Sequence, residues 1–438
     1  MRALGLNALL LVAVAAAAQS SSPAVTPAGS SAAPLLWQLQ ESGSTASLRG
    51  IFSVDSKVAW ASGTEGTVLR TLDGGEHWTK CTVPDAAGDG ATLDFRGVQA
   101  WDKDTAIVMA SGPGEKSRLY KTTDGCGTWG LILKNTDPDG FYDAFHFWNP
   151  QRGFLLGDPI LKTPFFKEES ASEYRAGQKY GYTEKKLVHR RFLTLVTPDG
   201  GKNWAYWGID RGDLTESAAS DGAAFSASNT AAFVPLQIDD SCQKDPLQGT
   251  NRIWVGIGGK AGARVLIGMR NPIDYCPIDP KDSYSQAIRY GWSVPRPVPI
   301  VGHNESSGVF SLAFRFGRSA STQSEFEGLP EMADSHGYVN GVAVGGDYLK
   351  PNESAGTAAW SADSGWTWAA SNQPPHGYRS AVQWSEALRL WITVGTNGSD
   401  ISHDDGKTWQ PLDDGEWNAL SLPFVVGPKG RIARLVER

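Results

Sequence analysis

The side chains best suited to chemistry are arginines and an aspartate that recur at one position of an internal repeat. In seven aligned segments this position holds Arg49, Arg96, Asp143, Ala223, Phe310, Arg379 and Asn418. A guanidinium group donates paired hydrogen bonds to a carboxylate or a phosphate, so clustered arginines are suited to gripping an anion. The alignment predicts that Arg49, Arg96, Arg379 and Asp143 face one shared opening.

Three further acids are expected on the same face of the molecule. They follow the second strand of their repeats and are Glu65, Asp158 and Asp347. These carboxylates can pair with the arginines and pin the centre of the fold, or they can flank a site for an anionic ligand or a peptide. Both interpretations stay open at this point, and the pattern assigns no catalytic residue.

Five copies of one eight-residue signature, S/T-x-D-x-G-x-x-W, divide the chain. They match the Asp-box (BNR-type) pattern and occupy residues 71–78, 122–129, 197–204, 361–368 and 402–409. The carboxylate accepts backbone N–H groups across a tight turn, glycine allows a positive φ, and tryptophan covers the neighbouring strands. The second copy departs, with Cys126 at the glycine position. We therefore expect structural roles for Asp73, Asp124, Asp199, Asp363 and Asp404.

Short alternating runs of β-branched and aromatic residues precede each signature and indicate strands. Seven such units predict an all-β fold, a seven-bladed β-propeller with Asp-box turns. Six or eight blades are the alternatives, because the middle of the chain is divergent. The last unit stops after three strands, and residues 35–40 resemble the strand that follows each signature. We expect this N-terminal strand to complete the last blade and close the ring, which removes exposed sheet edges.

In a propeller the first strand of each blade lines the central channel. That strand begins on the face where the second and third strands connect, whereas the Asp-box turns fall on the opposite face. This geometry separates the predicted binding residues from the structural aspartates.

The composition limits the classes of function. The 438 residues carry a net charge of −7 and a pI near 5.6, which argues against general nucleic-acid binding. Motifs for nucleotide cofactors, serine hydrolases and zinc proteases are absent from the sequence. We predict no cofactor and no metal.

The N-terminus predicts export. Residues 1–18 match a cleaved signal peptide, residues 19–34 form a linker rich in Ser, Ala and Pro, and residues 35–438 form a single propeller. The expected location is periplasmic or secreted. In an exported chain the four cysteines can form disulfides, for which we expect Cys81–Cys126 and Cys242–Cys276.

Two long insertions interrupt the repeats, at residues 159–191 and 316–335. The first carries a basic cluster, made of Lys185, Lys186, His189, Arg190 and Arg191. This cluster is a solvated charged loop or a docking site for an acidic partner.

The repeats around residues 68–78 resemble the photosystem II stability and assembly factor family and its bacterial relatives. The resemblance runs from about residue 37 to the C-terminus. It implies an exported, non-catalytic seven-bladed propeller that holds a membrane-protein precursor through an arginine-rich patch. By position, Arg49, Arg96 and Arg379 are the nearest counterparts of that patch. The implied partner is a protein or an anionic ligand, with membrane contact only through the partner and no nucleic acid.

Two other functions share the same features. A sialidase-like glycoside hydrolase would use the arginine cluster and Asp143, with Tyr142 or Tyr378 as nucleophile, but the sequence pairs neither tyrosine with a dedicated Glu. A carbohydrate-binding propeller would expose aromatic residues such as Tyr174, Tyr180 and Tyr182. The sequence sets no oligomeric state.

Overall fold

Short antiparallel strands make up nearly all of the regular structure. The computed structural model describes residues 34–83, 90–160, 191–206, 222–234, 252–270, 290–292, 295–318 and 336–438. Within these ranges the helices are two single 3₁₀ turns, η1 (Gly90–Thr92) and η2 (Gly114–Lys116). The all-β prediction is confirmed. No helix in the described ranges has the length and apolar character needed to cross a membrane.

Five sheets each contain four strands, and neighbouring strands follow one another in the sequence in four of them. The first consists of β2 (Leu48–Ser53), β3 (Ala59–Gly63), β4 (Thr67–Thr71) and β5 (Thr79–Thr82). The second consists of β6 (Phe95–Ala100), β7 (Ala106–Ala110), β8 (Arg118–Thr122) and β9 (Gly130–Lys134). The third consists of β10 (Tyr142–Phe147), β11 (Gly153–Ile160), β12 (Arg191–Thr197) and β13 (Ala205–Tyr206).

Nine strands form one larger sheet in the middle of the chain. Its first part holds β14 (Ala232–Phe233), β15 (Arg252–Gly259), β16 (Arg264–Arg270), β17 (Tyr290–Trp292) and β18 (Arg296–Pro297). Its second part holds β19 (Asn304–Arg318), β20 (His336–Asp347), β21 (Ala358–Ser361) and β22 (Ala369–Ala370). The two parts are joined by the β15–β19 pairing, in which Gly258 faces Gly308 and Gly259 faces Asn304.

The last two four-stranded sheets come from the C-terminal part of the chain and the first strand. One contains β23 (Ala381–Ser385), β24 (Leu390–Gly395), β25 (Gly398–Ser402) and β26 (Gln410–Asp413). The other has the order β1–β29–β28–β27, with β27 (Ala419–Ser421), β28 (Phe424–Val426), β29 (Ile432–Glu437) and β1 (Leu35–Gln40). Strand β1 is antiparallel to β29 over all six of its residues, so the two ends of the described chain share one sheet.

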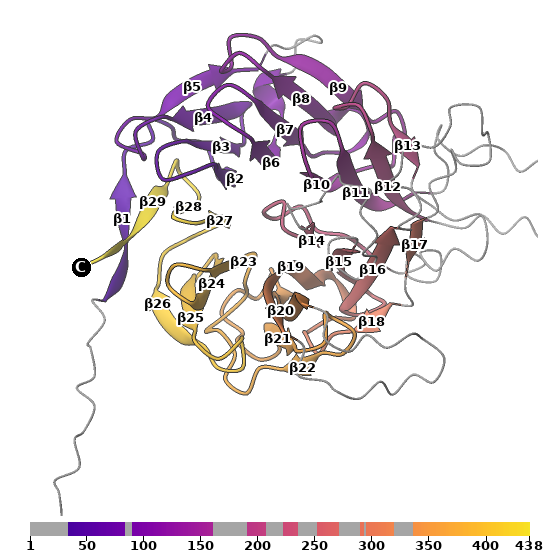
Figure 1. The fold of residues 1–438 in the computed structure, drawn as a ribbon, viewed down its shortest axis with the longest axis vertical. Coiled ribbons are helices and arrows are strands. Elements are labelled where there is room, and N and C mark those ends of the chain that lie inside the picture. The colour runs from indigo at the N-terminus through magenta and orange to yellow at the C-terminus, as the bar shows by residue number, and fades with distance from the viewer. Residues whose placement is uncertain are drawn as a thin grey trace, which may run out of the picture. The chain divides into compact units, whose positions relative to one another are not determined.

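Within residues 35–438 the sheets are arranged around a common centre (Figure 1). The first strands β2, β6, β10, β19, β23 and β27 lie nearest this centre, and the later strands lie farther out. Strands β3 and β7 are buried at every residue, because both faces of their sheets are covered. Such strands are expected to be apolar throughout, as the sequence AIVMA of β7 is.

Apolar clusters between successive sheets form the core. Trp60 and Val68 of the first sheet pack with Phe95 and Val108 of the second. Equivalent clusters join each sheet to the next, and one joins Leu48 and Ile51 of β2 to Phe424 and Val426 of β28. The first and last sheets therefore pack against each other.

Polar side chains on the inner strands bind the backbone of the adjacent sheet. The Gln99 amide donates to the Phe147 carbonyl and accepts from the Phe147 N–H, both at 2.7 Å. Asn229 makes the same two-way contact with Phe145. These side chains satisfy backbone groups that an inner strand leaves open towards the centre.

The five repeated turns, residues 71–78, 122–129, 197–204, 361–368 and 402–409, share one hydrogen-bond pattern. In the first, the Thr71 hydroxyl donates to Asp73 and accepts from the Gly75 N–H at 2.9 Å, while Asp73 accepts from the His77 N–H at 3.0 Å. The other four turns repeat these contacts through the residues at the same positions. In the second turn, hydrogen bonds from Thr128 lower the pKa of Asp124 to about 2.

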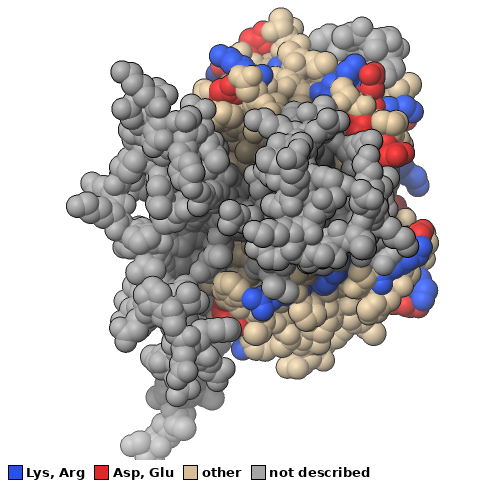
Figure 2. Space-filling view, turned by 90° about the vertical axis from the view of Figure 1, so that its right-hand side faces the viewer, with Lys and Arg blue, Asp and Glu red and all other residues tan. Residues whose placement is uncertain are grey.

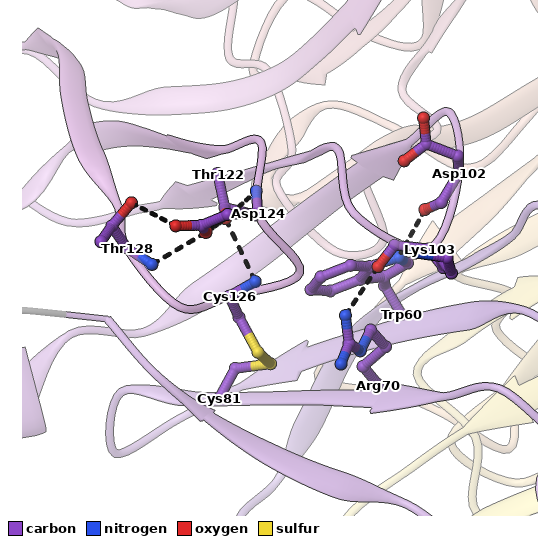
Figure 3. The surroundings of a disulfide bond; sticks show 9 residues. All are labelled: Trp60, Arg70, Cys81, Asp102, Lys103, Thr122, Asp124, Cys126 and Thr128. Atoms are coloured by element: carbon purple, nitrogen blue, oxygen red, sulfur yellow. Dashed lines mark hydrogen bonds between the residues drawn. A yellow bond between two sulfur atoms is a disulfide. The ribbon is translucent and has the colours of Figure 1, made fainter.

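Cys126 joins the second repeated turn to the first sheet. It forms a disulfide with Cys81 on β5, with the two Cα atoms 5.6 Å apart (Figure 3). Cys126 has a φ of +68°, whereas the glycines at its position in the other turns have φ of +80° to +93°. The Cys81–Cys126 prediction is confirmed. Around it, Arg70 donates to the Lys103 carbonyl and the Trp60 indole to the Asp102 carbonyl, so several contacts tie these two sheets together.

Several predictions lie outside the described residues. They are the signal peptide, the linker apart from Pro34, the Cys242–Cys276 disulfide, the basic cluster Lys185–Arg190 with the Arg191 side chain, and Tyr174, Tyr180 and Tyr182. On the part of the described surface visible in Figure 2, Lys and Arg residues alternate with Asp and Glu residues, without a patch of one sign.

Removal of the disulfide should lower stability. For a crosslink between residues 45 positions apart, the expected loss in unfolding free energy is about 2–4 kcal/mol. Two double variants separate the crosslink from the turn: Cys81→Ala with Cys126→Gly, and Cys81→Ala with Cys126→Ala. Because only glycine adopts the positive φ without strain, the glycine version should be more stable by about 0.5–1 kcal/mol. Denaturant unfolding measures both differences, and equal stability of the two variants would contradict the role assigned to the turn.

Candidate binding site

A cavity of about 510 Å³ lies where the inner strands converge. Residues from four of the sheets, and from segments next to the strands of the other two, line it, and they include Arg49, Arg96, Asp143, Ala223, Phe310, Tyr378 and Asn418. Six of these occupy the repeat position aligned in the sequence. The seventh aligned residue, Arg379, is replaced in the lining by its neighbour Tyr378.

β-Bulges direct four of these side chains to the centre. The strand register shifts at Arg49 in β2, at Arg96 in β6, at Asp143 in β10 and at Phe310 in β19. A bulged residue leaves the regular alternation of side chains between the two sheet faces. A β-bulge thus recurs in four of the inner strands, and each time the bulged residue lines the cavity.

Arg49 and Arg96 share one carboxylate. Asp94, just before β6, lies 3.3 Å from Arg49 Nε and accepts a 2.8 Å hydrogen bond from Arg96 Nε. Arg96 also donates to the Ser226 hydroxyl at 3.0 Å and lies over the Phe141 ring. Two guanidinium groups against one carboxylate leave an excess of one positive charge. We call Arg49 and Arg96 the arginine pair and Asp94 its shared acid.

The arginine pair is incompletely satisfied. Arg49 Nε is buried and has no hydrogen-bond partner among the described residues. Burial lowers the pKa of Arg49, and Arg96 adds to this effect while Asp94 opposes it. About a third of the Arg49 side chain remains accessible. An anion in the cavity can therefore reach the accessible part of this side chain, although Nε itself is covered.

Two carboxyl groups lie beside this positive charge. Asp143 is 1% exposed, and its Oδ2 has no hydrogen-bond partner among the described residues. Asp158, on β11, accepts a 3.1 Å hydrogen bond from the Ala224 N–H. Burial raises the pKa of Asp143 well above its usual range, the nearby Asp158 carboxylate raises it further, and Arg96 opposes the shift.

Arg379 lies outside the cavity lining, contrary to the prediction of a shared mouth. Its fully buried guanidinium pairs with Asp400, donates to Asn397 Oδ1 at 2.6 Å, and contacts His376. The sequence alignment located the residue along the chain but not its partner, which is 21 positions away on β25. Arg379 therefore stabilises the segment just before β23 through buried contacts.

Glu65 and Asp347 are also absent from the cavity lining. Glu65 is exposed in the β3–β4 turn with a φ of +58°. Asp347 accepts hydrogen bonds from the Ser306 hydroxyl at 2.7 Å and the Leu349 N–H at 3.0 Å, which organises the loop after β20. Of the seven predicted binding residues, Arg49, Arg96, Asp143 and Asp158 are brought together.

The sequence reasoning missed Asp94 and the aromatic lining. Asp94 stands two positions before Arg96, a spacing that places side chains on one side of a strand, and this could have revealed it. Phe141, Phe225 and Tyr348 line the cavity, together with Tyr378, which the sequence analysis named only as a nucleophile of the glycosidase alternative. No sequence signal separated them from core aromatics.

Comparison with solved structures identifies the fold. A structure described as YCF48 bound to D1 peptide is 15% identical, with a TM-score of 0.50, and the match covers 94% of this chain and 100% of that one. YCF48 from Cyanidioschyzon merolae is 16% identical, with a TM-score of 0.35 over 91% of this chain and 98% of that one. The chain is a β-propeller. No family model and no curated protein matches its sequence.

A glycoside hydrolase structure also resembles the propeller at low similarity. The GH74 enzyme of Niastella koreensis is 14% identical, with a TM-score of 0.32, over 88% of this chain and 56% of that one. At 15% identity and a TM-score of 0.50, the first of these comparisons shows the fold alone, and the function of this propeller has to be argued from its own cavity.

The raised pKa of Asp143 predicts how the stability of the propeller changes with pH. The folded propeller holds the Asp143 proton more tightly than the unfolded chain does. The contribution of this proton to the unfolding free energy is largest below the pKa that Asp143 has in the unfolded chain. Above that pKa it falls by about 1.4 kcal/mol for each pH unit, until the pKa of Asp143 in the folded protein is passed. Asp143→Asn cannot ionise, so its unfolding free energy relative to the wild type should increase as the pH rises above the ordinary range of a carboxyl group, about pH 4.

Denaturant titrations across this pH range test the sign. The matched control is Asp139→Asn, at an exposed residue of the preceding turn, whose stability relative to the wild type should stay nearly constant. A pH-independent difference between Asp143→Asn and the wild type would contradict the raised pKa.

Arg379 and an exposed arginine should behave differently on truncation. Arg379→Ala leaves Asp400 buried without its ion pair, so we expect a loss of about 3–5 kcal/mol in unfolding free energy. Arg389→Ala, which removes an arginine side chain that is 71% exposed, should cost less than about 1 kcal/mol. Denaturant unfolding compares the two variants. Similar stabilities would argue against a bracing role for Arg379.

Proposed function

We propose that this protein is an exported, non-catalytic binding or assembly scaffold that holds a protein partner at the central cavity. The observation that carries the proposal is the arginine pair: Arg49 and Arg96 share the single carboxylate of Asp94 and remain partly accessible in the cavity. An anionic group of a partner would complete this arrangement. The YCF48 structure with the same fold is bound to a D1 peptide, and this supports a protein partner here.

We further propose seven blades in a closed ring. The nine-stranded sheet would count as two blades, because β14–β18 and β19–β22 each belong to a separate unit of the sequence repeat. The β15–β19 pairing that joins them is short and consists of Gly258 with Gly308 and Gly259 with Asn304. The pairing of β1 with β29 supports closure by the N-terminal strand. The five repeated turns would then be Asp-box turns with a structural function.

Export is proposed from the sequence of residues 1–18, with a linker up to residue 34 and the propeller from residue 35. The Cys81–Cys126 disulfide supports an oxidising compartment such as the periplasm or the exterior. Mass determination of the mature protein from its native host would locate the cleavage site.

The sialidase-like alternative is less well supported by the cavity. Arg379 is occupied by Asp400, which leaves two arginines in the described lining, and the catalytic pattern expected by that alternative uses three. Turnover of a fluorogenic sialoside that is lost in Asp143→Asn would favour the glycosidase and contradict a purely binding function.

Capture of the native partner tests the proposed site. Immobilised wild-type protein is compared with Arg49→Ala/Arg96→Ala in extracts of the native host, with bound proteins quantified by mass spectrometry. We expect the specific partner to be depleted at least tenfold on the double variant, because its anionic group loses both guanidinium donors.

The matched control removes the same charge elsewhere. Lys80→Ala/Lys103→Ala changes two exposed lysines and should retain the partner. Equal thermal stability of both double variants is established first. Unchanged capture by the folded arginine variant would overturn the proposed site.

A further inference from the structure

Three aromatic rings pack together in the lining of the cavity. Phe225 and Phe310 stack with ring centroids 4.0 Å apart, and Tyr378 packs perpendicular to Phe310 at 4.9 Å. These three rings form an apolar cluster of their own, separate from the clusters between sheets. We call Phe225, Phe310 and Tyr378 the aromatic wall. The three side chains are buried, and each of them also lines the cavity.

This apolar surface continues outward onto the rim. Tyr348 lines the cavity, contacts Phe310 edge-on at 6.1 Å, and is 48% exposed. Leu349 beside it is 69% exposed, the largest exposed fraction among the large apolar side chains of the described residues. Two adjacent exposed apolar side chains at the edge of a cavity are typical of a binding surface, because single ones are ordinarily scattered.

The aromatic and charged sides meet inside the cavity. Arg49 and Tyr378 lie close enough for each to influence the pKa of the other. The cavity volume of about 510 Å³ falls within the range of about 300–1,000 Å³ typical of ligand sites. One ligand segment can therefore contact both sides at once.

The charges limit the anion that fits. The arginine pair has an excess of one positive charge, and the carboxylates of Asp158 and Glu305 in the same lining oppose any further negative charge. A carboxylate, with one charge, suits this balance better than a phosphate group with up to two.

We propose that the cavity recognises a peptide segment in which a carboxylate lies directly beside an aromatic or large aliphatic side chain. The carboxylate binds Arg49 and Arg96, and the apolar side chain lies against Phe310 and Tyr348. This inference rests on the proposed function, since it specifies the partner chemistry of the same site. The aromatic side supplies apolar burial and so distinguishes such a segment from other acidic peptides.

Fluorescence anisotropy with short labelled peptides tests the inference on the mature full-length protein. The peptides are capped at both ends and differ only at a central Asp-Phe pair, with Asp-Ala, Asn-Phe and phosphoserine-Phe as the alternatives. We expect Asp-Phe to bind at least tenfold more tightly than each of the others. Equal binding of Asp-Phe and Asp-Ala would overturn the inference, as would tighter binding of the phosphopeptide or no binding by any peptide.

Two variants assign the contributions to the two sides. Tyr348→Ser/Leu349→Ser should weaken Asp-Phe about tenfold and leave Asp-Ala unchanged, whereas Arg49→Gln/Arg96→Gln should weaken both. Leu131→Ser, at a residue 44% exposed on β9, is the matched apolar control and should change neither. If the arginine variant alone reduces binding, the aromatic specificity is wrong and the arginine site stands. If the arginine variant has no effect, the proposed function fails as well.

Discussion

Every sheet in this protein has two apolar faces, and only the neighbouring sheets can cover them. Strands such as β3 and β7 are buried throughout, so a sheet taken alone would expose both faces to water. The intersheet clusters therefore fix how closely successive sheets approach. At Gly50, a Cβ atom would lie 3.2 Å from the Arg96 carbonyl oxygen of the next sheet, which shows how little space remains near the centre. The position of the cavity follows from this packing.

Close packing at the centre also explains the form of the binding site. A charged side chain on a regular inner strand would have to enter an apolar intersheet layer, at a high desolvation cost. The bulges at Arg49 and Arg96 reduce this cost by turning these side chains into the cavity, where they stay partly accessible, whereas Asp143 at the third bulge is buried and its pKa is raised. Arg379 shows the other solution, in which an inner arginine is buried but fully paired with Asp400 and Asn397. Equivalent sequence positions can thus serve recognition in one sheet and stability in another.

The strands and the repeated turns could be predicted well from the sequence, because both depend on residues that are close together along the chain. Alternating apolar residues and the Thr71–Asp73–Gly75 type of contact need only neighbours along the chain. The sequence placed Arg49, Arg96 and Asp143 correctly along their strands for the same reason. It could not place Arg379, whose partner Asp400 lies on β25, or identify Phe225 and Tyr348 as cavity residues. An aromatic residue in a strand-rich sequence is usually core, and only the three-dimensional register separates the two environments.

Stability and recognition are carried by largely different residues in this propeller. The intersheet clusters, the disulfide and the repeated turns hold the sheets together without contributing side chains to the cavity. Arg49, Arg96 and the rim residue Tyr348 contribute little to those clusters and remain partly accessible. Related propellers could therefore exchange cavity residues and change partners without a loss of fold, since the packing constraint acts on other positions. Asp143 is the exception, because its burial links the electrostatics of the cavity to the stability of the whole unit.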